Sequence, residues 1–385
     1  MLVIRNGTVV DAERTVEADV AVENGEIVAV GEVDAGDAAE IDADGQFVAP
    51  GLIDSHVHVM MDGRPDVATA TEESDYLSSF RTTANLRDAL AAGVTTLRDL
   101  GSRETLALDA GAAVSEGVID GPRILACGQN VIMTGGHGHW FGREADGPHE
   151  VRKAAREQLK RGADVVKCMA TGGVLTEGAV TGAPELTSEE LAALVDAAST
   201  KGVPTAAHAH GAAGIKNAVR AGISSIEHGT FMDREAAELM VEHDTYWVPT
   251  ASALHGIVEH GVEAGIPEEA VAKAEEAADH FDDAFDHALD LGVNVAMGTD
   301  AGTPFNFFAD IPRELQYMVD HGMDPAHALE AATVNAADLL GLDDSGLVAE
   351  GYRADLVVLP ADPTEDASAW QNAEHVVADG EVVDG

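Results

Sequence analysis

The chain has 385 residues, 45% of them hydrophobic, which is enough for one large domain with a smaller one and an ample core. Its 69 acidic and 22 basic residues give a formal net charge of −47, spread over the whole chain. Such a negative field repels nucleic acid and anionic membranes, which excludes both as expected partners, and no apolar run of about 18 residues predicts a membrane span.

Residues 1–50 predict short strands separated by tight turns. Asn-Gly and Asp-Gly pairs such as Asn6-Gly7 lie between alternating apolar residues, a pattern typical of hairpins. Residues 345–385 repeat the pattern in the runs ADLVVLPADP and EHVVADGEVVDG. Because neither half could bury a core alone, the two ends are predicted to form one small composite β-sandwich domain.

Residues 51–344 alternate apolar strands with amphipathic stretches. The predicted strands are GLIDSHVHV, VTTLRDL, RILACGQNV, ADVVKCMA, PTAAHAH, SSIEHG, TYWVPT and NVAMGTD. Roughly eight strand–helix units predict an α/β fold, a (β/α)8 TIM-like barrel, better than an open doubly wound sheet. The chain also lacks the glycine-rich phosphate and dinucleotide signatures that many open sheets carry.

The pair His56 and His58 closes the first predicted barrel strand. Side chains on a strand alternate with a period of two, so both imidazoles leave the same face. At the carboxyl end of a barrel strand that face looks into the active-site mouth, where two imidazoles can bind one metal. A lone His-x-His pair is weak evidence, and the remaining strands decide the matter.

Four further polar residues lie in the last part of other predicted strands, where the strand ends of a closed barrel meet. They are Lys167, His208, His228 and Asp300. Singly, His208 could be a core histidine, Lys167 a lysine that extends its amine to solvent and Asp300 a helix N-cap. Together they would require independent coincidences at five strand ends, which favours a metal site.

The motifs APGLIDSHVH, KCMATGG, AAHAHG, IEHGT and MGTDAG, in this order, resemble those of the amidohydrolase superfamily over essentially the whole chain. They are most similar to its prolidase-like and imidazolonepropionase-like branch, as is the split terminal sandwich. The resemblance implies a metal-dependent hydrolase that cleaves an amide or peptide bond of a small substrate. That substrate would be an Xaa-Pro or other dipeptide, or an N-acyl amino acid.

The resemblance also implies a ligand set for two divalent metals. The first metal would be held by His56, His58 and Asp300, and the second by His208 and His228. Lys167 would join them, because an ammonium cannot sit between two metals but a lysine carbamylated by CO2 is a bridging carboxylate. Zinc suits this set best, with manganese, iron and cobalt as alternatives.

The implied reaction uses a hydroxide shared by the two metals. Coordination lowers the pKa of water, so this hydroxide forms near neutral pH and attacks the carbonyl while a metal polarises its oxygen. By the same resemblance Asp300 accepts the proton and passes it to the leaving nitrogen. Asp300 and the carbamylated Lys167 are therefore the predicted catalytic residues.

Other residues near the predicted mouth are candidates for substrate contact. His137 and His139 lie on the glycine-rich loop TGGHGHW, and His210 follows His208 by two residues on the same strand face. Polar loop histidines or structural hydrogen bonds explain them as well. The cations near predicted loops that could hold a substrate carboxylate are Arg64, Arg103 and Arg143.

Two other functions stay open. An imidazolonepropionase-like cyclic amide hydrolase, or a deaminase, would use one metal and no lysine carbamate, and Lys167 within KCMATGG argues against both. A scaffold protein that has lost its metal is disfavoured because all the ligand residues are present. The expected partner is a small-molecule substrate. Metal identity, side-chain preference and a homo-oligomer are left open by the sequence.

Two cysteines, Cys127 and Cys168, are too few for a disulfide framework and fit a reducing compartment. The start of the chain lacks a basic segment followed by an apolar one, so no signal peptide is expected and a cytoplasmic location is predicted. Because molar salt screens like-charge repulsion, a salt-rich, halophilic cytoplasm is the leading explanation of the charge. An unusually acidic enzyme from an ordinary cell is the alternative.

We expect the melting temperature and activity to rise between roughly 0.1 and 2 M KCl, because the Debye length falls from about 10 Å at 0.1 M to about 3 Å at 1 M. Thermal unfolding followed by circular dichroism across this range checks the prediction. A melting temperature that stays flat or falls would refute the halophilic interpretation and leave the enzyme assignment standing.

Overall fold

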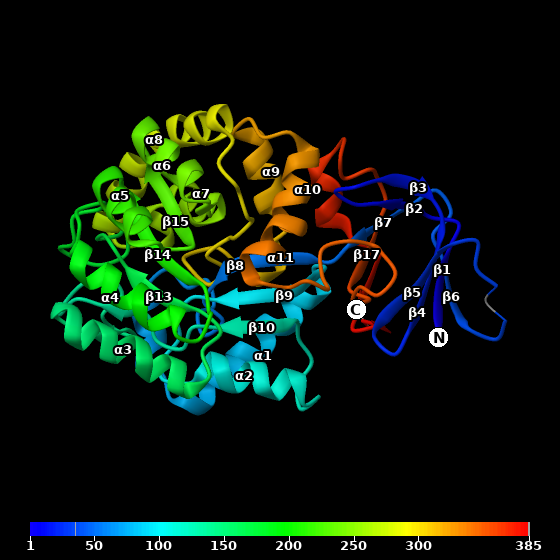
Figure 1. Ribbon diagram of the computed structural model, residues 1–385, viewed down its shortest axis with the longest axis horizontal. Helices are drawn as coiled ribbons and strands as arrows, with labels where there is room; N and C mark the ends of the chain where they lie inside the picture. The colour runs from blue at the N-terminus through cyan, green and yellow to red at the C-terminus, as the bar shows by residue number, and fades with distance from the viewer. Residues whose placement is uncertain (35, 384–385) are drawn as a thin grey trace.

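Strands from both ends of the chain pair with one another in the computed structural model, which describes residues 1–34 and 36–383 (Figure 1). One sheet has the order β19-β18-β17-β7-β2-β3 and the other the order β5-β4-β1-β6. The first contains β2 (Thr8–Val10), β3 (Thr15–Glu17), β7 (Phe47–Pro50), β17 (Leu356–Leu359), β18 (His375–Ala378) and β19 (Glu381–Val382). The second contains β1 (Leu2–Arg5), β4 (Asp19–Glu23), β5 (Glu26–Gly31) and β6 (Ala39–Asp42).

The join between the two ends is the antiparallel pair β7 and β17, in which Pro50 lies opposite Leu356. One buried apolar cluster draws on both sheets, with Ile4 and Val22 from one and Val48 and Leu356 from the other. This cluster explains why the two ends of the chain fold together, since each sheet covers the apolar face of the other.

Parallel strands form the rest of the sheet structure. A three-stranded sheet has the order β10-β9-β8 and a six-stranded sheet the order β12-β11-β13-β14-β15-β16. The first contains β8 (Leu52–Val57), β9 (Val94–Asp99) and β10 (Arg123–Ala126). The second contains β11 (Val131–Ile132), β12 (Arg143–Glu144), β13 (Val166–Met169), β14 (Thr205–Gly211), β15 (Ser225–Phe231) and β16 (Tyr246–Val248).

The last predicted strand, NVAMGTD, forms no regular ladder strand among the described residues. Residues 293–301 instead make isolated parallel bridges, Val295 with Trp247 of β16 and Ala301 with Val57 of β8. Some backbone groups of this segment form hydrogen bonds to side chains instead of to a neighbouring strand. One example is Thr299 N, which donates to Asp54 Oδ1 at 3.2 Å. The segment passes so close to its neighbours that a Cβ on Gly298 would lie 2.4 Å from Val248 Cγ1.

Helices alternate with the parallel strands and lie outside them (Figure 1). They are α1 (Asp75–Ala91), α2 (Leu106–Ser115), α3 (Gly147–Arg161), α4 (Ser188–Ser199), α5 (Ala212–Ala221), α6 (Arg234–Glu242), α7 (Ala251–His260), α8 (Glu268–Leu291), α9 (Arg313–Asp320), α10 (Pro325–Ala332) and α11 (Val334–Leu340). Short 3-10 helices are η1 (Val67–Glu72), η2 (Val262–Ala264), η3 (Phe308–Asp310) and η4 (Ala367–Asn372). Among the described residues, no helix combines the length and the hydropathy that a membrane span requires.

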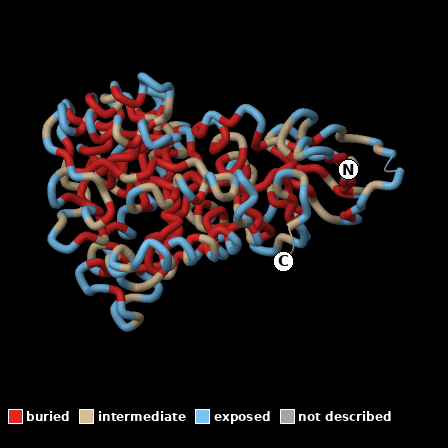
Figure 2. Tube along the Cα trace, turned by 90° about the horizontal axis from the view of Figure 1, so that it is seen from below, coloured by how far each residue is buried: buried red, intermediate tan, exposed pale blue. Residues whose placement is uncertain are grey.

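The core of this α/β body is one large cluster of small and branched side chains (Figure 2). The buried face of α8 carries Ala274, Ala277, Ala284 and Ala288, which allow close packing. Both cysteines are buried free thiols, and burial raises the pKa of the Cys168 thiol to about 12. Because the strands run parallel, their carboxyl ends lie at the same edge, and this edge holds the polar residues described next.

Candidate metal centre

All the predicted metal ligands line one cavity at the carboxyl ends of the parallel strands. His56 is the penultimate residue of β8 and His58 follows the strand. Lys167 lies on β13, His208 on β14 and His228 on β15, whereas Asp300 lies within the bridged segment 293–301. Each of these side chains is buried. The structure therefore brings together residues that the sequence spreads over more than half of the chain.

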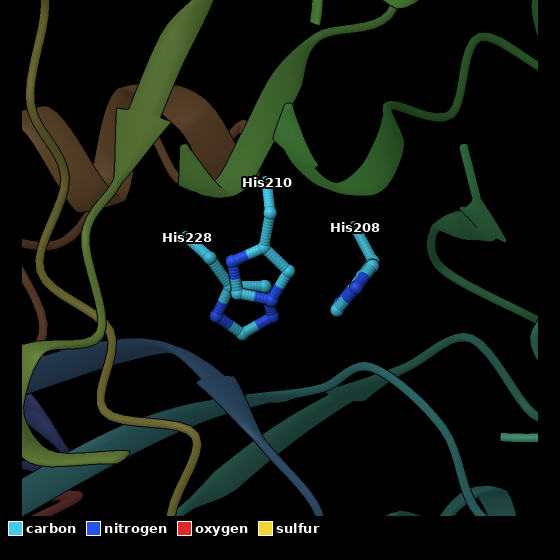
Figure 3. Close-up of side chains that lie close together, drawn as sticks. All are labelled: His208, His210 and His228. Carbon is cyan, nitrogen blue, oxygen red and sulfur yellow. The ribbon is translucent and has the colours of Figure 1, made fainter. Parts of the chain in front are cut away.

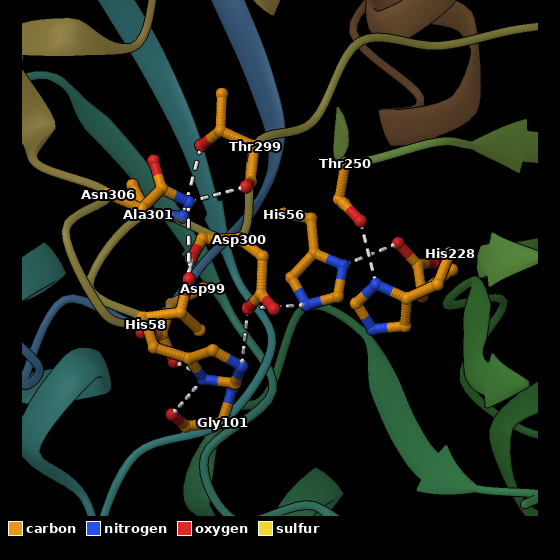
Figure 4. Close-up of polar contacts among 12 residues, drawn as sticks. His56, His58, Asp99, Gly101, His228, Thr250, Thr299, Asp300, Ala301 and Asn306 are labelled. Atoms are coloured by element: carbon orange, nitrogen blue, oxygen red, sulfur yellow. Dashed lines mark hydrogen bonds and ion pairs between the residues drawn. The ribbon is translucent and has the colours of Figure 1, made fainter. Parts of the chain in front are cut away.

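His56, His58 and Asp300 form the first cluster (Figure 4). Asp300 Oδ1 lies 3.4 Å from His56 Nε2 and 3.3 Å from His58 Nε2. The other ring nitrogen of each histidine is already engaged. His58 Nδ1 donates to the Gly101 carbonyl at 2.7 Å, and His56 Nδ1 lies 2.9 Å from Glu227 Oε2. A neutral ring that donates from Nδ1 keeps a lone pair on Nε2.

Two nitrogen lone pairs therefore face one carboxylate oxygen in a buried site. Burial lowers the pKa of His58 to about 4 and lowers that of His56 as well, so neither ring supplies a second proton near neutral pH. Among the residues described, Asp300 Oδ1 has no hydrogen-bond partner. Burial raises the pKa of Asp300 to about 8, but one proton could serve only one of the two nitrogens. A divalent cation fits this set of acceptors.

His208, His210 and His228 form the second cluster (Figure 3). The rings of His210 and His228 stack with centroids 4.9 Å apart and planes at 13°, and the His208 ring lies 4.6 Å from that of His228. His208 Nε2 is a buried atom without a hydrogen-bond partner in the described chain. Buried polar atoms are normally paired, so this unpaired nitrogen fits the role of a metal ligand.

Lys167 lines the same cavity and its side chain is 1% exposed. It takes part in none of the ion pairs found among residues 1–34 and 36–383. Burial lowers the pKa of its amine, although the charges of Glu227 and Asp300 oppose that effect. A neutral amine is the form that reacts with CO2, so the environment suits the predicted carbamate.

The predicted substrate contacts are placed differently from one another. His137 and His210 line the cavity, and the His137 ring lies 4.4 Å from that of His208. His210 also belongs to the second cluster, close enough to serve as a ligand. His139 is exposed and lies outside the cavity lining, with Nδ1 3.2 Å from the Gly136 carbonyl.

The three arginines proposed for a substrate carboxylate lie elsewhere, which corrects that expectation. Arg64 pairs with Asp62 and Glu73, Arg103 with Asp75, and Arg143 with Glu157. In so acidic a chain the arginines are held by nearby carboxylates.

Most of the remaining cavity wall is apolar, formed by Met61, Trp140, Phe141, Met169, Val174, Leu175, Leu254 and Ile257.

Supporting residues around the ligands were missed by the sequence analysis. Glu227 accepts a hydrogen bond from His56, and its other oxygen accepts one from Arg98 at 3.1 Å. The side chains of Glu227 and Arg98 are both 0% exposed. Asp54 binds Thr299 beside Asp300, and Asp99 accepts from Val59 N beside His58. The one available signal was an ionised side chain within an apolar strand, as with Arg98 in VTTLRDL.

Comparison with known proteins gives consistent results. Residues 47–383 match the Amidohydrolase family. The ochratoxinase of Aspergillus niger is 32% identical over 359 residues, which cover 85% of this chain and 73% of that protein. A crystal structure of a Xaa-Pro dipeptidase with bound methionine in the active site has a TM-score of 0.93 and 33% identity, with 100% of each chain covered. A prolidase complexed with N-methylphosphonate-L-proline has a TM-score of 0.93 and 31% identity, with 99% of each chain covered.

We expect Glu227→Gln to weaken metal binding about 10–100-fold, the usual effect of losing a residue that orients a ligand. Arg98 and Ser225 donate to one oxygen of Glu227, so the glutamine would keep its carbonyl there and turn its NH2 toward His56. His56 Nδ1 would then accept, Nε2 would carry the hydrogen, and the lone pair would be lost. Chelator competition measures the affinity.

The same variant also weakens a buried ion pair, whose disruption costs about 3–5 kcal/mol when one partner is removed. Metal binding is therefore compared at a temperature where circular dichroism shows the variant to be folded. Wild-type affinity in folded Glu227→Gln protein would contradict the role given to Glu227.

Proposed function

The chain belongs to the amidohydrolase family, and from this premise we propose that it cleaves an amide bond of a small substrate with the help of two divalent metals. It is a hydrolase that acts on carbon–nitrogen bonds. The proposed substrate is an Xaa-Pro or other dipeptide, or an N-acyl amino acid. The observation that carries the proposal is the pair of ligand clusters on one cavity, with Lys167 in the same lining.

Each metal has a natural set of residues in this arrangement. His56, His58 and Asp300 would hold the first, His208 and His228 the second, and carbamylated Lys167 would join the two. Zinc suits imidazole nitrogen with carboxylate oxygen, and manganese, iron or cobalt are alternatives. Bound there, the metals supply Lewis acidity, which activates water and polarises the substrate carbonyl.

The leaving nitrogen needs a proton, because an amide anion is a very poor leaving group. Asp300 is the one carboxylate among the described residues that line the cavity. We therefore assign Asp300 the transfer of the proton from water to the leaving nitrogen. Its neighbours Asp54 and Thr299 hold the backbone around it, since Thr299 donates to Asp54 Oδ2 at 2.6 Å.

The walls of the cavity define the substrate side. Apolar side chains such as Trp140 and Leu254 exclude water and suit apolar groups next to the scissile bond. His137 and His210 are the polar groups placed to orient the substrate, and His139 stays a prediction that the exposed position of its ring does not support. The proposed partner is a small molecule, and the proposal involves no nucleic acid or membrane.

We also propose the domain division that the sequence suggests. Residues 51–344 would form the catalytic (β/α)8 TIM-like barrel, and residues 1–50 with 345–385 the composite sandwich domain. Every residue that lines the cavity lies between His56 and Thr303, which supports placing the whole reaction in the first domain. The segment 293–301, bridged to both β16 and β8, would occupy the position of the eighth strand.

A cyclic amide hydrolase or deaminase with one metal is the second candidate. It is favoured by one observation, that His56, His58 and Asp300 form a complete cluster without Lys167. Metal stoichiometry separates the two candidates, because only the first needs a second ion and a carbamate.

The proposal predicts close to two metals per chain in zinc- or manganese-loaded protein, and hydrolysis of some member of a panel of Xaa-Pro, Xaa-Arg and N-acyl amino acid substrates in high salt. Elemental analysis measures the metal and amine release measures the reaction. His208→Ala should reduce both severely. One metal per chain with turnover only of cyclic amides would establish the second candidate, and full activity in His208→Ala would overturn the site.

Lys167→Ala should leave a folded, nearly inactive protein that has lost the second metal, because no other residue of the cluster supplies an anion placed between two ions. Acetate or propionate should restore part of the activity by filling the vacated space with a carboxylate. Mass spectrometry of native protein should find one CO2 on Lys167. A crystal map with a bare Lys167 amine turned away from bound metal would exclude the carbamate.

A further inference from the structure

Thr250, the residue that precedes α7, has an unusual backbone conformation. Its φ of 57° and ψ of 47° place it in the left-handed region, which β-branched residues rarely adopt. In this conformation its side chain makes no capping hydrogen bond to α7. The fold therefore gives up an ordinary helix cap at this point, and something else must satisfy the first N–H groups of the helix.

Glu314 satisfies them from another helix. It lies in the first turn of α9, its side chain is fully buried, and its carboxylate accepts from Ala251 N at 2.7 Å, Ser252 N at 2.7 Å and Ser252 Oγ at 2.6 Å. A carboxylate at a helix N-terminus also interacts favourably with the helix dipole. Glu314 thus fixes the start of α7 and with it the backbone of Thr250.

The side chain of Thr250 is thereby free to bind a histidine (Figure 4). Thr250 Oγ1 donates its single hydrogen to the Pro249 carbonyl at 2.7 Å, and it lies 2.7 Å from His228 Nδ1. Because the hydroxyl hydrogen is already used, His228 Nδ1 must be the donor in the second contact. His228 Nε2 then keeps the lone pair that a metal requires.

We propose that Glu314 and Thr250 form a relay that positions His228 as a metal ligand. Glu314 holds the start of α7, α7 holds Thr250 in the left-handed conformation, and Thr250 fixes both the ring orientation and the tautomer of His228. Neither residue belongs to the two ligand clusters, so both are positioning residues. The inference rests on the proposed metal site and adds to it the means by which the second cluster is held.

Four variants test the relay. Thr250→Val removes the hydroxyl and keeps the branched shape, Thr250→Ser keeps the hydroxyl as the matched control, and Glu314→Gln removes one acceptor oxygen. The fourth combines Thr250→Val with Glu314→Gln. The readouts are metal affinity by titration, the visible spectrum of cobalt-loaded protein, and kcat separately from KM.

We expect Thr250→Val and Glu314→Gln each to weaken one of the two metals by about 10-fold or more, with the other metal unchanged. The cobalt spectrum should change for that metal alone, and kcat should fall with KM nearly constant. Thr250→Ser should resemble the wild type. The double variant should bind no more weakly than Thr250→Val, because the effect of Glu314 passes through the hydroxyl.

Independent effects that multiply in the double variant would overturn the relay, as would wild-type metal affinity in both single variants. If Glu314→Gln fails to fold, Ser252→Ala removes one of the hydrogen bonds to Glu314 and should weaken the same metal to a smaller extent. Unchanged affinity there would also contradict the relay. A wild-type protein that binds no metal would overturn the proposed function and the relay together, whereas two metals with intact variants would overturn the relay alone.

Discussion

The arrangement of the cavity depends on keeping buried imidazoles neutral with one chosen nitrogen free. Desolvation lowers the pKa of each histidine in the two clusters, to about 3 for His210. The rings are therefore neutral, and hydrogen bonds rather than ion pairs fix their orientation. A neutral ring has one N–H and one lone pair, and a partner at Nδ1 decides which nitrogen carries which. The structure supplies such partners as a carbonyl at His58, a carboxylate at His56 and hydroxyls at His210 and His228.

The backbone is strained at three residues of the cavity. His228, Thr250 and Asp300 all have positive φ, at 70°, 57° and 60°. Such conformations persist only where surrounding contacts hold them. Trp247 Nε1 donates to the carbonyl of His228, and Glu314 fixes the residues after Thr250. Part of the stabilisation from the apolar core therefore offsets the conformational strain at these three residues.

How much of this could be predicted depends on whether a signal is local. His56, His58, Lys167, His208, His228 and Asp300 could be grouped from the sequence, because polar residues at the ends of apolar strands stand out and parallel topology brings those ends together. The α/β class and the family followed from the same pattern. The irregular path of residues 293–301 could not be predicted, because the apolar run looks like a strand and the close passage of Gly298 between Val248 and His56 depends on the tertiary fold. Glu314 and Glu227 were missed because their partners are remote in sequence. Arg64, Arg103 and Arg143 were misplaced because carboxylates outside the cavity hold them in ion pairs.

The charge of the chain bears on the site in a way that separates long-range from local electrostatics. Acidic side chains give the whole molecule a net charge of −47, but among the described residues of the cavity lining Asp300 alone is acidic. The long-range field attracts divalent cations toward the molecule, and salt screens this field beyond about 10 Å at 0.1 M. A cation in the cavity would be held by lone pairs at contact distance in a buried site, and salt screens such contacts much less. High salt can therefore relieve repulsion across the surface without weakening contacts inside the cavity, and a strongly acidic surface is compatible with a buried cluster made mainly of neutral imidazoles.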